Sequence, residues 1–523
     1  MNCDRLWQRA QQHVAARRLD AGEASLRELL QADPAHVHAR LLLASVCLAR
    51  GSRRDGCREA VLASQTLPDD ARVIATVAAS LFRIGETVAA RDCLRHPAVA
   101  ACRDGEALAQ LAHVHKQLGE HAQALALIER AHGHGYASAE FHYFRGSQLQ
   151  VVGALADAAE SFRSAIRARV TQGPAWYALL RMGQSLGDDD LAGLDSALRQ
   201  VAPDGADRVA LAFARYVLLD RQSRLDEAWQ ALEQANALAA ARNAVPSPVE
   251  QSLGDALAAL AECAVTPTAE QPHTGGPQPI FIIGMPRSGT TLLERLLGKH
   301  ADVVTPGELP DFAHQLMWCA DVHGNGLLDP QLPERLRDLD YADLGARYLR
   351  QTQWRATDQA HFVDKMPTNF MFAGLIHKAL PRAPILHLVR DPMDVCYSNW
   401  RVLFGDGGYA YPYAFDSLAS YYARYAQLMR RWHAAMPGVI LDVHYDALVS
   451  DTEQVMRRVL AHCGLRFDAA CLDVAGNRTP VATLSNVQVR EGVYRHAVGA
   501  WQRYEMQLQP LRALLQQHGV ADA

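Results

Sequence analysis

The chain has 523 residues, which is too many for one ordinary hydrophobic core, so we expect two or three domains. Its formal net charge of −5, with 21% charged residues, excludes the broad basic surface that general nucleic-acid or membrane binding requires. The ten cysteines lack the paired spacing of a zinc site, and no uncharged run approaches the roughly 20 residues that span a bilayer. We therefore expect reduced thiols and a cytoplasmic protein.

Residues 1–264 are predicted to form an all-α repeat domain, because a helical pattern is interrupted there at regular intervals. Glycines recur every 34 residues, and alanines follow three of them after 12 residues, where a second helix must approach the first closely. The glycines are Gly51, Gly85, Gly119, Gly153 and Gly187, the alanines are Ala63, Ala131 and Ala165, and Pro97 breaks the pattern after Gly85. The spacing resembles the tetratricopeptide repeat, whose unit is a helix-turn-helix.

The ends of this array are less regular. Arg17 and Arg221 stand where further glycines of the series would fall, so about seven helical pairs are expected, and residues 246–263 suggest one more helix. Stacked pairs build a superhelix with a concave groove, which usually binds a peptide or a partner protein. The alternatives are a surface for homodimer formation and a spacer.

A linker is predicted at residues 265–279. Four prolines and two glycines occur in residues 266–279 without periodicity. The second domain is accordingly expected at residues 280–523.

A phosphate-binding loop is predicted at the start of this second domain. Ile280–Ile283 is a short β-branched run suited to a buried parallel strand, and a helical pattern begins after Gly289. Gly284 and Gly289 let backbone N–H groups and the helix N-terminus converge on an anion. The spacing is that of the nucleotide P-loop, except that Thr290 stands where a nucleoside triphosphatase has its lysine and the positive charge is on Arg287.

The segment Pro286–Thr291 resembles the loop with which sulfotransferases bind the 5′-phosphosulfate of 3′-phosphoadenosine-5′-phosphosulfate. The resemblance implies that this donor, rather than a nucleoside triphosphate, is the co-substrate and that no metal is needed. The residues that it assigns to the 5′ end of the donor are Arg287, Ser288, Gly289, Thr290 and Thr291. A chance glycine-rich turn is the alternative.

A central parallel sheet is expected around this loop, because short apolar runs alternate with helical stretches. The later runs are residues 362–363, 385–389 and 439–443. Sheets of this kind carry helices on both faces and bind ligands at the carboxyl ends of their strands.

Arg390 and Ser398 are candidate ligands for a phosphate. Arg390 directly follows an apolar run, Asp391 and Pro392 form a helix start, and Ser398 falls two turns into that helix. A forked guanidinium and a hydroxyl can hold one dianionic phosphate. In the resembled family such a pair holds the 3′-phosphate of the donor, whereas the alternative for Arg390 is a salt bridge to Asp391 or Asp394.

Glu308 and Lys365 are the candidate catalytic pair. In tyrosylprotein sulfotransferases, a Glu in this region is the general base for the acceptor hydroxyl, and a Lys in the segment that matches residues 363–367 stabilises the departing oxygen. The resemblance gives these roles to Glu308 and Lys365, with Arg287 also at the departing oxygen. The alternatives are a surface carboxylate and a solvated loop lysine. The cytosolic branch uses a His base, and His314 lacks a matching context.

The remaining donor contacts are predicted in the C-terminal part of the chain. Tyr445 corresponds to a family position beside the adenine, where a flat ring can stack. A later segment resembles a donor-binding loop and includes Ser485 as a catalytic orienting donor, with Gln488, Val489 and Arg490. The cytosolic branch has two adjacent basic residues where this chain has Arg490-Glu491, so the contribution of this loop to 3′-phosphate binding stays open.

As a whole, the chain resembles bacterial proteins that join tetratricopeptide repeats to a sulfotransferase domain. The resemblance implies transfer of a sulfuryl group to an acceptor hydroxyl, and a tyrosine of a protein or peptide is our candidate acceptor. A P-loop phosphotransferase is one alternative, disfavoured by Thr290. A repeat scaffold with an inactive nucleotide-binding domain is another, disfavoured because Arg287, Glu308, Lys365, Arg390 and Ser398 are all present. The sequence does not separate a tyrosine from a sugar, lipid or small phenol.

Overall fold

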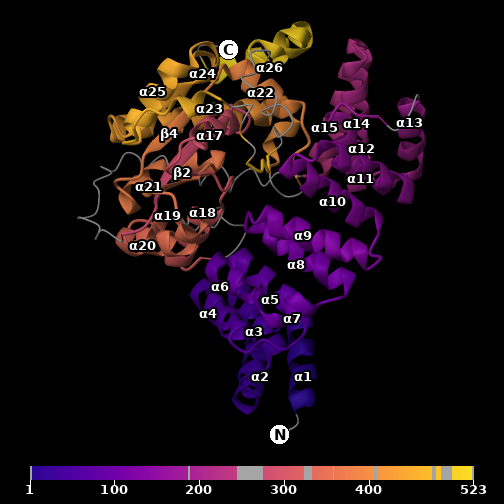
Figure 1. Cartoon of the computed structure of the whole chain (residues 1–523), viewed down its shortest axis with the longest axis vertical. Helices are drawn as coiled ribbons and strands as arrows, with labels where there is room; N and C mark the ends of the chain where they lie inside the picture. Colours follow the sequence, from indigo (N-terminus) through magenta and orange to yellow (C-terminus); the bar gives the residue numbers. More distant parts are fainter. Residues whose placement is uncertain are drawn as a thin grey trace.

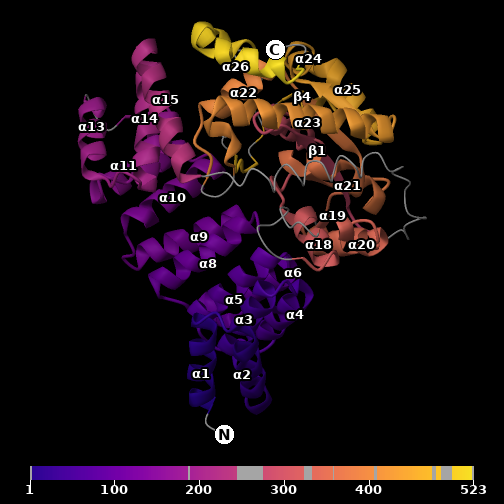
Figure 2. The ribbon, with the colours of Figure 1, turned by 180° about the vertical axis from the view of Figure 1, so that it is seen from behind.

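A computed structural model describes residues 3–185, 189–243, 275–322, 332–356, 358–405, 409–473, 477, 479–483 and 497–520. A helical array begins at the N-terminus and runs along one side of an α/β domain (Figure 1), and the two chain ends lie at opposite ends of the molecule (Figure 2). The predicted fold class, a helical repeat array followed by an α/β domain with a parallel sheet, is confirmed.

The repeat array consists of helices that pack in successive pairs. Ala63, Ala131 and Ala165, predicted where the two helices of a pair approach closely, are fully buried. Pro97 begins a short extra helix, as its fixed φ favours at that position. The helices are α1 (Cys3–Ala15), α2 (Leu19–Ala32), α3 (Val37–Ala49), α4 (Arg53–Ser64), α5 (Ala71–Ile84), α6 (Thr87–Cys93), α7 (Pro97–Ala101), α8 (Gly105–Gln117), α9 (His121–Gly133), α10 (Ala139–Val152), α11 (Leu155–Ala168), α12 (Gly173–Arg181), α13 (Asp190–Gln200), α14 (Ala206–Arg221) and α15 (Leu225–Arg242).

A residue with left-handed backbone separates the helices of most pairs. The φ angle is 85° at Gly51, 90° at Gly85, 82° at Gly119 and 89° at Gly153. This conformation disfavours a Cβ, which explains why glycine recurs there. Arg17, predicted to stand at the same place in the first unit, is also left-handed, with a φ of 54°. The 34-residue spacing is therefore confirmed for these turns.

The spacing shifts in the last two units. The left-handed residues there are Gly183 and Ser223. The expectation for Arg221 is wrong, because α14 extends through this residue and its guanidinium donates to the carbonyl of Gly183 at 3.0 Å. Arg221 thus closes the turn after α12 instead of forming a turn itself. Gly187 and the helix suggested at residues 246–263 lie outside the described residues.

Five parallel strands form the sheet in the order β2-β3-β1-β4-β5. The predicted apolar runs fall on four of these strands, and β2 is a short edge strand. Ile280 and Ile282 contribute to one apolar cluster and Phe281 and Ile283 to another, so helices cover both faces of the sheet. The strands are β1 (Gln278–Gly284), β2 (Val303–Val304), β3 (His361–Asp364), β4 (Ile385–Val389) and β5 (Ile440–His444).

Ten α-helices of the described residues belong to the α/β domain. None of the described helices is both long and apolar enough to cross a membrane, and the nine cysteines among the described residues are free thiols. The predicted linker falls largely outside the described residues, so its bounds stay a prediction. The helices are α17 (Thr290–Leu297), α18 (Asp311–Cys319), α19 (Leu332–Arg335), α20 (Tyr341–Thr352), α21 (Ala373–Ala379), α22 (Pro392–Trp400), α23 (Phe415–Ala435), α24 (Tyr445–Ser450), α25 (Thr452–His462) and α26 (Glu505–Gln517), with 3₁₀ turns at Gln353–Arg355, Pro367–Phe372, Tyr411–Tyr413, Ala469–Leu472 and Ala500–Tyr504.

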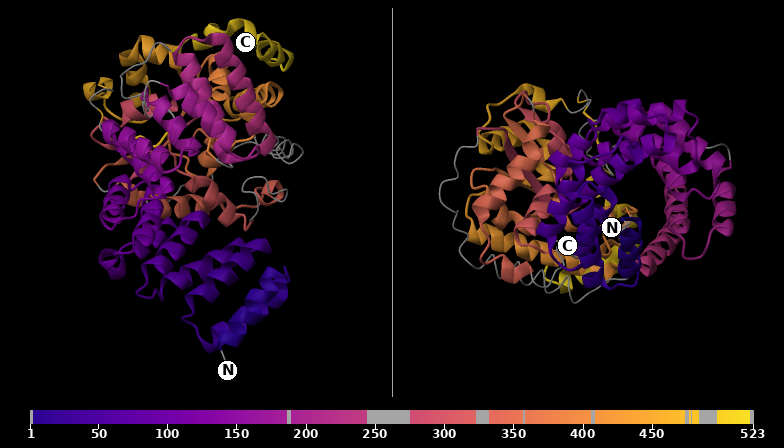
Figure 3. Two further views of the ribbon diagram at one scale, coloured as in Figure 1. Left: turned by 90° about the vertical axis from the view of Figure 1, so that its right-hand side faces the viewer. Right: turned by 90° about the horizontal axis from the view of Figure 1, so that it is seen from below.

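The repeat and α/β domains share one apolar core. Buried residues of helices α10 to α15 form a continuous cluster with buried residues on α18, α20, α23 and α26. Helices α3 to α10 have a second cluster, against which Trp318 and Trp354 of the α/β domain pack. Figure 3 shows that the first helices, drawn in indigo, extend away from the α/β domain, and they have a separate small core. The two domains are therefore joined along most of the array.

A buried polar network also fixes one repeat turn to the α/β domain. The Glu86 carboxylate accepts hydrogen bonds from Arg347 and from Gln351 Nε2, the latter at 2.9 Å. Thr87 Oγ1 donates to the Gln351 carbonyl at 2.6 Å, and Gln315 Nε2 donates to the Gly85 carbonyl at 2.8 Å. These hydrogen bonds all cross from one domain to the other, so the network specifies how the domains dock.

Candidate active site

Several of the predicted site residues in the described segments lie at the carboxyl ends of three neighbouring strands. The loop at 284–291 follows β1, Lys365 follows β3, and Arg390 follows β4. Because the strands are parallel, these ends lie at the same edge of the sheet.

The loop between β1 and α17 contains three residues with positive φ. The angles are 150° at Gly284, 71° at Arg287 and 109° at Gly289. A Cβ at Gly284 would come within 2.9 Å of the Leu388 carbonyl, and a Cβ at Gly289 would overlap the ring of Tyr445. Both glycines are therefore required by close packing. Left-handed backbone at a residue with a side chain, as at Arg287, is uncommon and is held in place by its surroundings.

Hydrogen bonds occupy the carbonyls of this loop. Asn399 Nδ2 donates to the Pro286 carbonyl at 2.8 Å, and Arg390 Nη1 donates to the Arg287 carbonyl at 3.2 Å. In the first turn of α17, the Leu292 N–H donates to the Gly289 carbonyl at 2.9 Å, whereas the N–H groups of Thr290 and Thr291 have no carbonyl partner within the helix. The loop thus combines fixed carbonyls with a helix N-terminus, an arrangement that favours an anion.

Two buried polar atoms beside the loop have no hydrogen-bond partner among the described residues. They are Ser288 Oγ and Arg390 Nε. Ser288 is 1% exposed, so water does not readily replace the missing partner. Ser398 lies next to them, and its Oγ accepts a hydrogen bond from Arg287 Nε at 3.3 Å. A hydroxyl and a guanidinium Nε that lack partners among the described residues, beside a helix N-terminus, fit a phosphate ligand, and the predicted donor residues are thus brought together.

The electrostatic environment of this end of the site is strongly positive. Burial, together with the nearby guanidiniums of Arg181, Arg401 and Arg390, lowers the pKa of Arg287 to about 9. An arginine stays charged at neutral pH. The part of the lowered pKa that comes from the neighbouring guanidiniums indicates a positive electrostatic potential, which a bound anion would reduce. The predicted alternative contact of Arg390 is also present, because Asp394 Oδ2 lies 3.5 Å from Arg390 Nη2.

At the other end of the site, Lys365 lies between two carboxylates. Its Nζ donates to Glu308 Oε1 at 2.7 Å and lies 3.8 Å from Glu294 Oε2. The Lys365 side chain is fully buried, whereas the Glu308 side chain is 43% exposed. Burial raises the pKa of Glu294, and the positive charge of Lys365 lowers it. Glu308 is therefore the carboxylate of this group that an acceptor can reach, and Lys365 is not the solvated loop lysine of the alternative.

Asp364, one residue before Lys365, is part of the support of that lysine. Its carboxylate accepts from Tyr348 Oη at 2.7 Å and from Asn369 Nδ2 at 3.3 Å. Complete burial raises the pKa of Asp364 to about 8, although the Tyr348 hydrogen bond lowers it. These contacts fix the backbone from which Lys365 extends.

Of the other predicted residues, Tyr445 lies at the loop and His314 lies away from it. Tyr445 packs on Gly289, and the Arg390 guanidinium lies 4.8 Å from the centre of its ring, so Tyr445 forms a wall of the loop. His314 is buried against Gly85 of the repeat domain, and burial lowers its pKa to about 4. His314 therefore belongs to the domain interface. Four residues lie outside the described residues, namely Ser485, Gln488, Val489 and Arg490.

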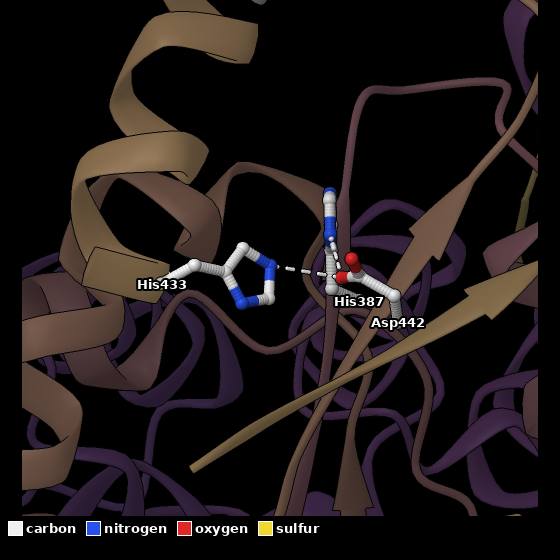
Figure 4. Close-up of side chains that lie close together, drawn as sticks. All are labelled: His387, His433 and Asp442. Carbon is white, nitrogen blue, oxygen red and sulfur yellow. Dashed lines mark hydrogen bonds and ion pairs between the residues drawn. The ribbon is translucent and has the colours of Figure 1, made fainter. Parts of the chain in front are cut away.

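A histidine–aspartate group supports β4 from the side of α23 (Figure 4). Asp442 Oδ1 lies 2.7 Å from His387 Nδ1 and 3.0 Å from His433 Nε2, and His387 Nε2 lies 2.6 Å from Tyr425 Oη. Within the described residues, this is the one set of three groups close enough to share a metal ion. Here the three groups satisfy one another by hydrogen bonds, and the expectation that no metal is needed stays a prediction.

Comparison with known proteins identifies the family of this region. Residues 279–469 match the model described as "Sulfotransferase family". These residues form a sulfotransferase-family domain. The match covers the loop after β1 and also Glu308, Lys365, Arg390 and Tyr445.

Three curated relatives extend over different shares of the chain. An uncharacterized protein of Aquifex aeolicus is 30% identical over 343 residues, which are 63% of this chain and 44% of that protein. Nodulation protein NoeE of Sinorhizobium fredii is 27% identical over 252 residues, covering 42% of this chain and 57% of that protein. A putative protein-tyrosine sulfotransferase of Caenorhabditis briggsae is 22% identical over 233 residues, covering 43% of this chain and 80% of that protein. The chain thus spans about half the length of the first two relatives.

Several residues near the candidate site were not predicted from the sequence. Glu294 lies on the same face of α17 as Thr290 and Thr291, and this spacing could have indicated it. Arg401 follows Ser398 by three residues, and Arg181 comes from the repeat domain. No spacing rule links Arg181 to the loop, since only tertiary structure brings α12 to this place.

Proposed function

We propose that this chain transfers a sulfuryl group from 3′-phosphoadenosine-5′-phosphosulfate to an acceptor hydroxyl. The observation that carries the proposal is the arrangement of two unlike groups at one sheet edge. The first is the anion site of Arg287, Ser288, Arg390 and Ser398, and the second is the buried Lys365 with the accessible carboxylate of Glu308. Such a pair suits a reaction in which an anionic group moves between two oxygens.

The proposed donor fits the residues that are present. Its 5′-phosphate would receive the loop N–H groups and the Ser288 hydroxyl, which has no other partner among the described residues. Its 3′-phosphate would receive the Arg390 guanidinium and the Ser398 hydroxyl. Position 290 carries a threonine instead of the lysine with which a P-loop phosphotransferase binds its triphosphate, which argues against that alternative.

Glu308 would act as the general base. Its carboxylate takes the proton of the acceptor hydroxyl while the acceptor oxygen bonds to sulfur and the bond from sulfur to the bridging oxygen breaks. The negative charge then lies on that departing oxygen. Lys365 Nζ is 2.7 Å from Glu308 Oε1, so neutralising Glu308 weakens this ion pair and frees the ammonium to donate to the departing oxygen. Proton removal and leaving-group stabilisation are coupled in this way through one hydrogen bond.

Nucleotide binding tests the donor assignment. We expect 3′-phosphoadenosine 5′-phosphate, the product left by the donor, to bind the full chain in calorimetry and to raise its melting temperature. ATP with Mg²⁺ should do so far more weakly, because it lacks the 3′-phosphate. Equal or stronger stabilisation by ATP would overturn the donor assignment.

For the acceptor, we propose a tyrosine side chain within a peptide or protein. The repeat turn at Gly119 supports this choice, since a Cβ there would lie 3.4 Å from the carbonyl of Pro306, two residues before Glu308. Tyr409, whose pKa is raised to about 12 by burial and by the Glu308 charge, adds an aromatic wall suited to a phenol ring. The repeat array would hold the flanking peptide and raise its effective concentration.

Acceptor kinetics with the full chain test this choice. A tyrosine peptide should have a kcat/KM at least about tenfold above that of N-acetyltyrosinamide, because only the peptide can contact the repeats. Deleting residues 1–264 is unsuitable as a test, because the deletion would uncover the shared core. Equal values for the two acceptors would leave the repeats without a role in acceptor binding, and a dimerisation or scaffold role would then be the better interpretation.

A further inference from the structure

We propose that Arg181, on the last turn of repeat helix α12, is a residue of the nucleotide site and binds the 3′-phosphate of the donor together with Ser398. The inference rests on the proposed donor. It gives the repeat domain a part in donor binding, beyond its proposed contact with the acceptor.

Helix α12 is anchored on the segment that follows α22. Tyr177 Oη accepts a hydrogen bond from the Leu403 backbone N–H at 3.0 Å. The ring of Phe213 lies 6.1 Å from the Tyr177 ring and 6.3 Å from the Tyr413 ring, which continues the contact into the α/β domain. These contacts are buried, so the position of α12 over this segment is fixed.

Arg181 extends from this anchored helix. It lies four residues after Tyr177, on the same face of α12, and its guanidinium is 5.3 Å from the centre of the Tyr177 ring. A cation–π contact of this kind holds the guanidinium in one orientation and leaves it charged. The helix face that contacts the α/β domain therefore carries a positioned guanidinium.

The electrostatics of Arg287 connect Arg181 with the loop. After burial, the Arg181 guanidinium is the group that lowers the pKa of Arg287 most, ahead of Arg401 and Arg390. Arg401 has Tyr216, Tyr397 and Asp220 near it, and Arg390 has Asp394 at 3.5 Å. For Arg287, the three guanidiniums lower the pKa and Tyr177 raises it. A convergence of four cations from two domains favours a multiply charged anion.

Ser398 links these cations to the 3′-phosphate site of the proposed donor. Arg287 Nε donates to Ser398 Oγ at 3.3 Å, so the Arg287 charge lies beside the hydroxyl proposed for that phosphate. A dianionic phosphate can accept from several guanidiniums at once, which a single-charged sulfonate does less well. Arg181 would thus add a third cation, from outside the sulfotransferase-family domain, to Arg390 and Arg287.

The test compares two nucleotides on three variants of the full chain. Calorimetry would measure 3′-phosphoadenosine 5′-phosphate and adenosine 5′-phosphate on the unaltered chain, Arg181→Ala, Arg181→Lys and Arg83→Ala. Arg83 is the matched control, because it stands on the last turn of α5, is exposed and hydrogen bonds only locally to Ser80.

We expect Arg181→Ala to weaken binding of the 3′-phosphorylated nucleotide about 10- to 100-fold and to leave adenosine 5′-phosphate nearly unaffected. Arg181→Lys should retain part of the affinity, since lysine keeps the positive charge but lacks the forked pair of N–H donors of a guanidinium. Arg83→Ala should bind both nucleotides like the unaltered chain.

Three results would contradict the inference. Unchanged affinity in Arg181→Ala would remove Arg181 from the nucleotide site. An equal loss for both nucleotides would contradict its assignment to the 3′-phosphate. Normal nucleotide binding with a raised KM for an acidic peptide would place it in the acceptor site instead. If the unaltered chain did not bind 3′-phosphoadenosine 5′-phosphate at all, the proposed donor itself would fail, which is a distinct outcome.

Discussion

The two ends of the candidate site differ in charge balance. At the Lys365 end, one buried ammonium lies between the carboxylates of Glu294 and Glu308, so opposite charges meet within the protein. At the Arg287 end, the guanidiniums of Arg181, Arg390 and Arg401 all lower the pKa of a fourth one. The charges at the Lys365 end are paired within the protein. The positive charges at the Arg287 end would be stabilised by a bound anion.

This difference assigns different chemistry to the two ends. A balanced ion pair can shift a proton and a charge with little reorganisation, which suits the reacting oxygens. An excess of buried cations gains free energy only when an anion arrives, which suits binding. Changes at the Lys365 end should therefore alter stability and turnover, and changes at the Arg287 end should alter affinity.

The largest effect is expected from Lys365→Met. This change leaves the buried Glu294 carboxylate without its cation, and the free energy of unfolding at neutral pH should fall by about 3–5 kcal/mol. Denaturant titrations would measure this loss. Lys299→Met, which removes a partly exposed lysine 3.5 Å from Asp473, is the control and should cost under about 1 kcal/mol.

The loss in Lys365→Met should also depend on pH. Burial already raises the pKa of Glu294, and removing the Lys365 charge raises it further. The folded state then holds a proton that the unfolded state releases, so stability falls as pH rises above the ordinary Glu range. The difference from the unaltered chain should accordingly be larger at pH 8 than at pH 5, and a loss that does not change with pH would contradict this account.

Glu308→Gln should have the next largest effect, and on turnover without a change in nucleotide affinity. Glutamine keeps an oxygen for Lys365 but cannot take the acceptor proton, so kcat should fall by about 10²- to 10⁴-fold while nucleotide affinity stays the same. Steady-state kinetics and calorimetry would separate the two quantities. The surface change Glu453→Gln on α25 is the control. Retained turnover in Glu308→Gln would assign proton removal to another group.

Arg390→Ala should have the smallest of the three effects, and on affinity. It removes a charge-assisted contact of about 1.5–3 kcal/mol to the 3′-phosphate, so the 3′-phosphorylated nucleotide should lose more affinity than adenosine 5′-phosphate. Arg382→Ala, an exposed position just before β4, is the control at the other end of the same strand. Equal losses for both nucleotides would place Arg390 elsewhere.

The sequence predicts local structure well where one residue type is required by the backbone. Gly51, Gly85, Gly119 and Gly153 mark left-handed turns, and the β-branched run before Gly284 marks the central strand. Arg390 and Lys365 could be predicted at strand ends because Arg390 follows an apolar run directly and Lys365 follows one after a single residue. Their catalytic and binding roles stay predictions until they are measured.

The remaining features depend on contacts between distant parts of the chain. Arg181 reaches the site only because α12 packs on the segment after α22, and no local pattern contains that information. The shift of the last repeat turns to Gly183 and Ser223 is similar, since it follows from the length of α12 and α14 and from the contacts of Arg221. The sequence also left the domain docking unpredicted, because Glu86 and Gln351 are 265 residues apart.

The shared core has a consequence for synthesis of the protein. Tyr216 of α14 and Tyr397 of α22 are both buried in it, and they are 181 residues apart in the chain. At a rate of roughly 5–20 residues per second, the apolar face of α14 would emerge from the ribosome roughly 10 to 40 s before its covering helices exist. During that interval the nascent repeat domain exposes a surface that invites aggregation. Ribosome-associated chaperones should therefore bind nascent chains of this protein until the sheet domain has been translated.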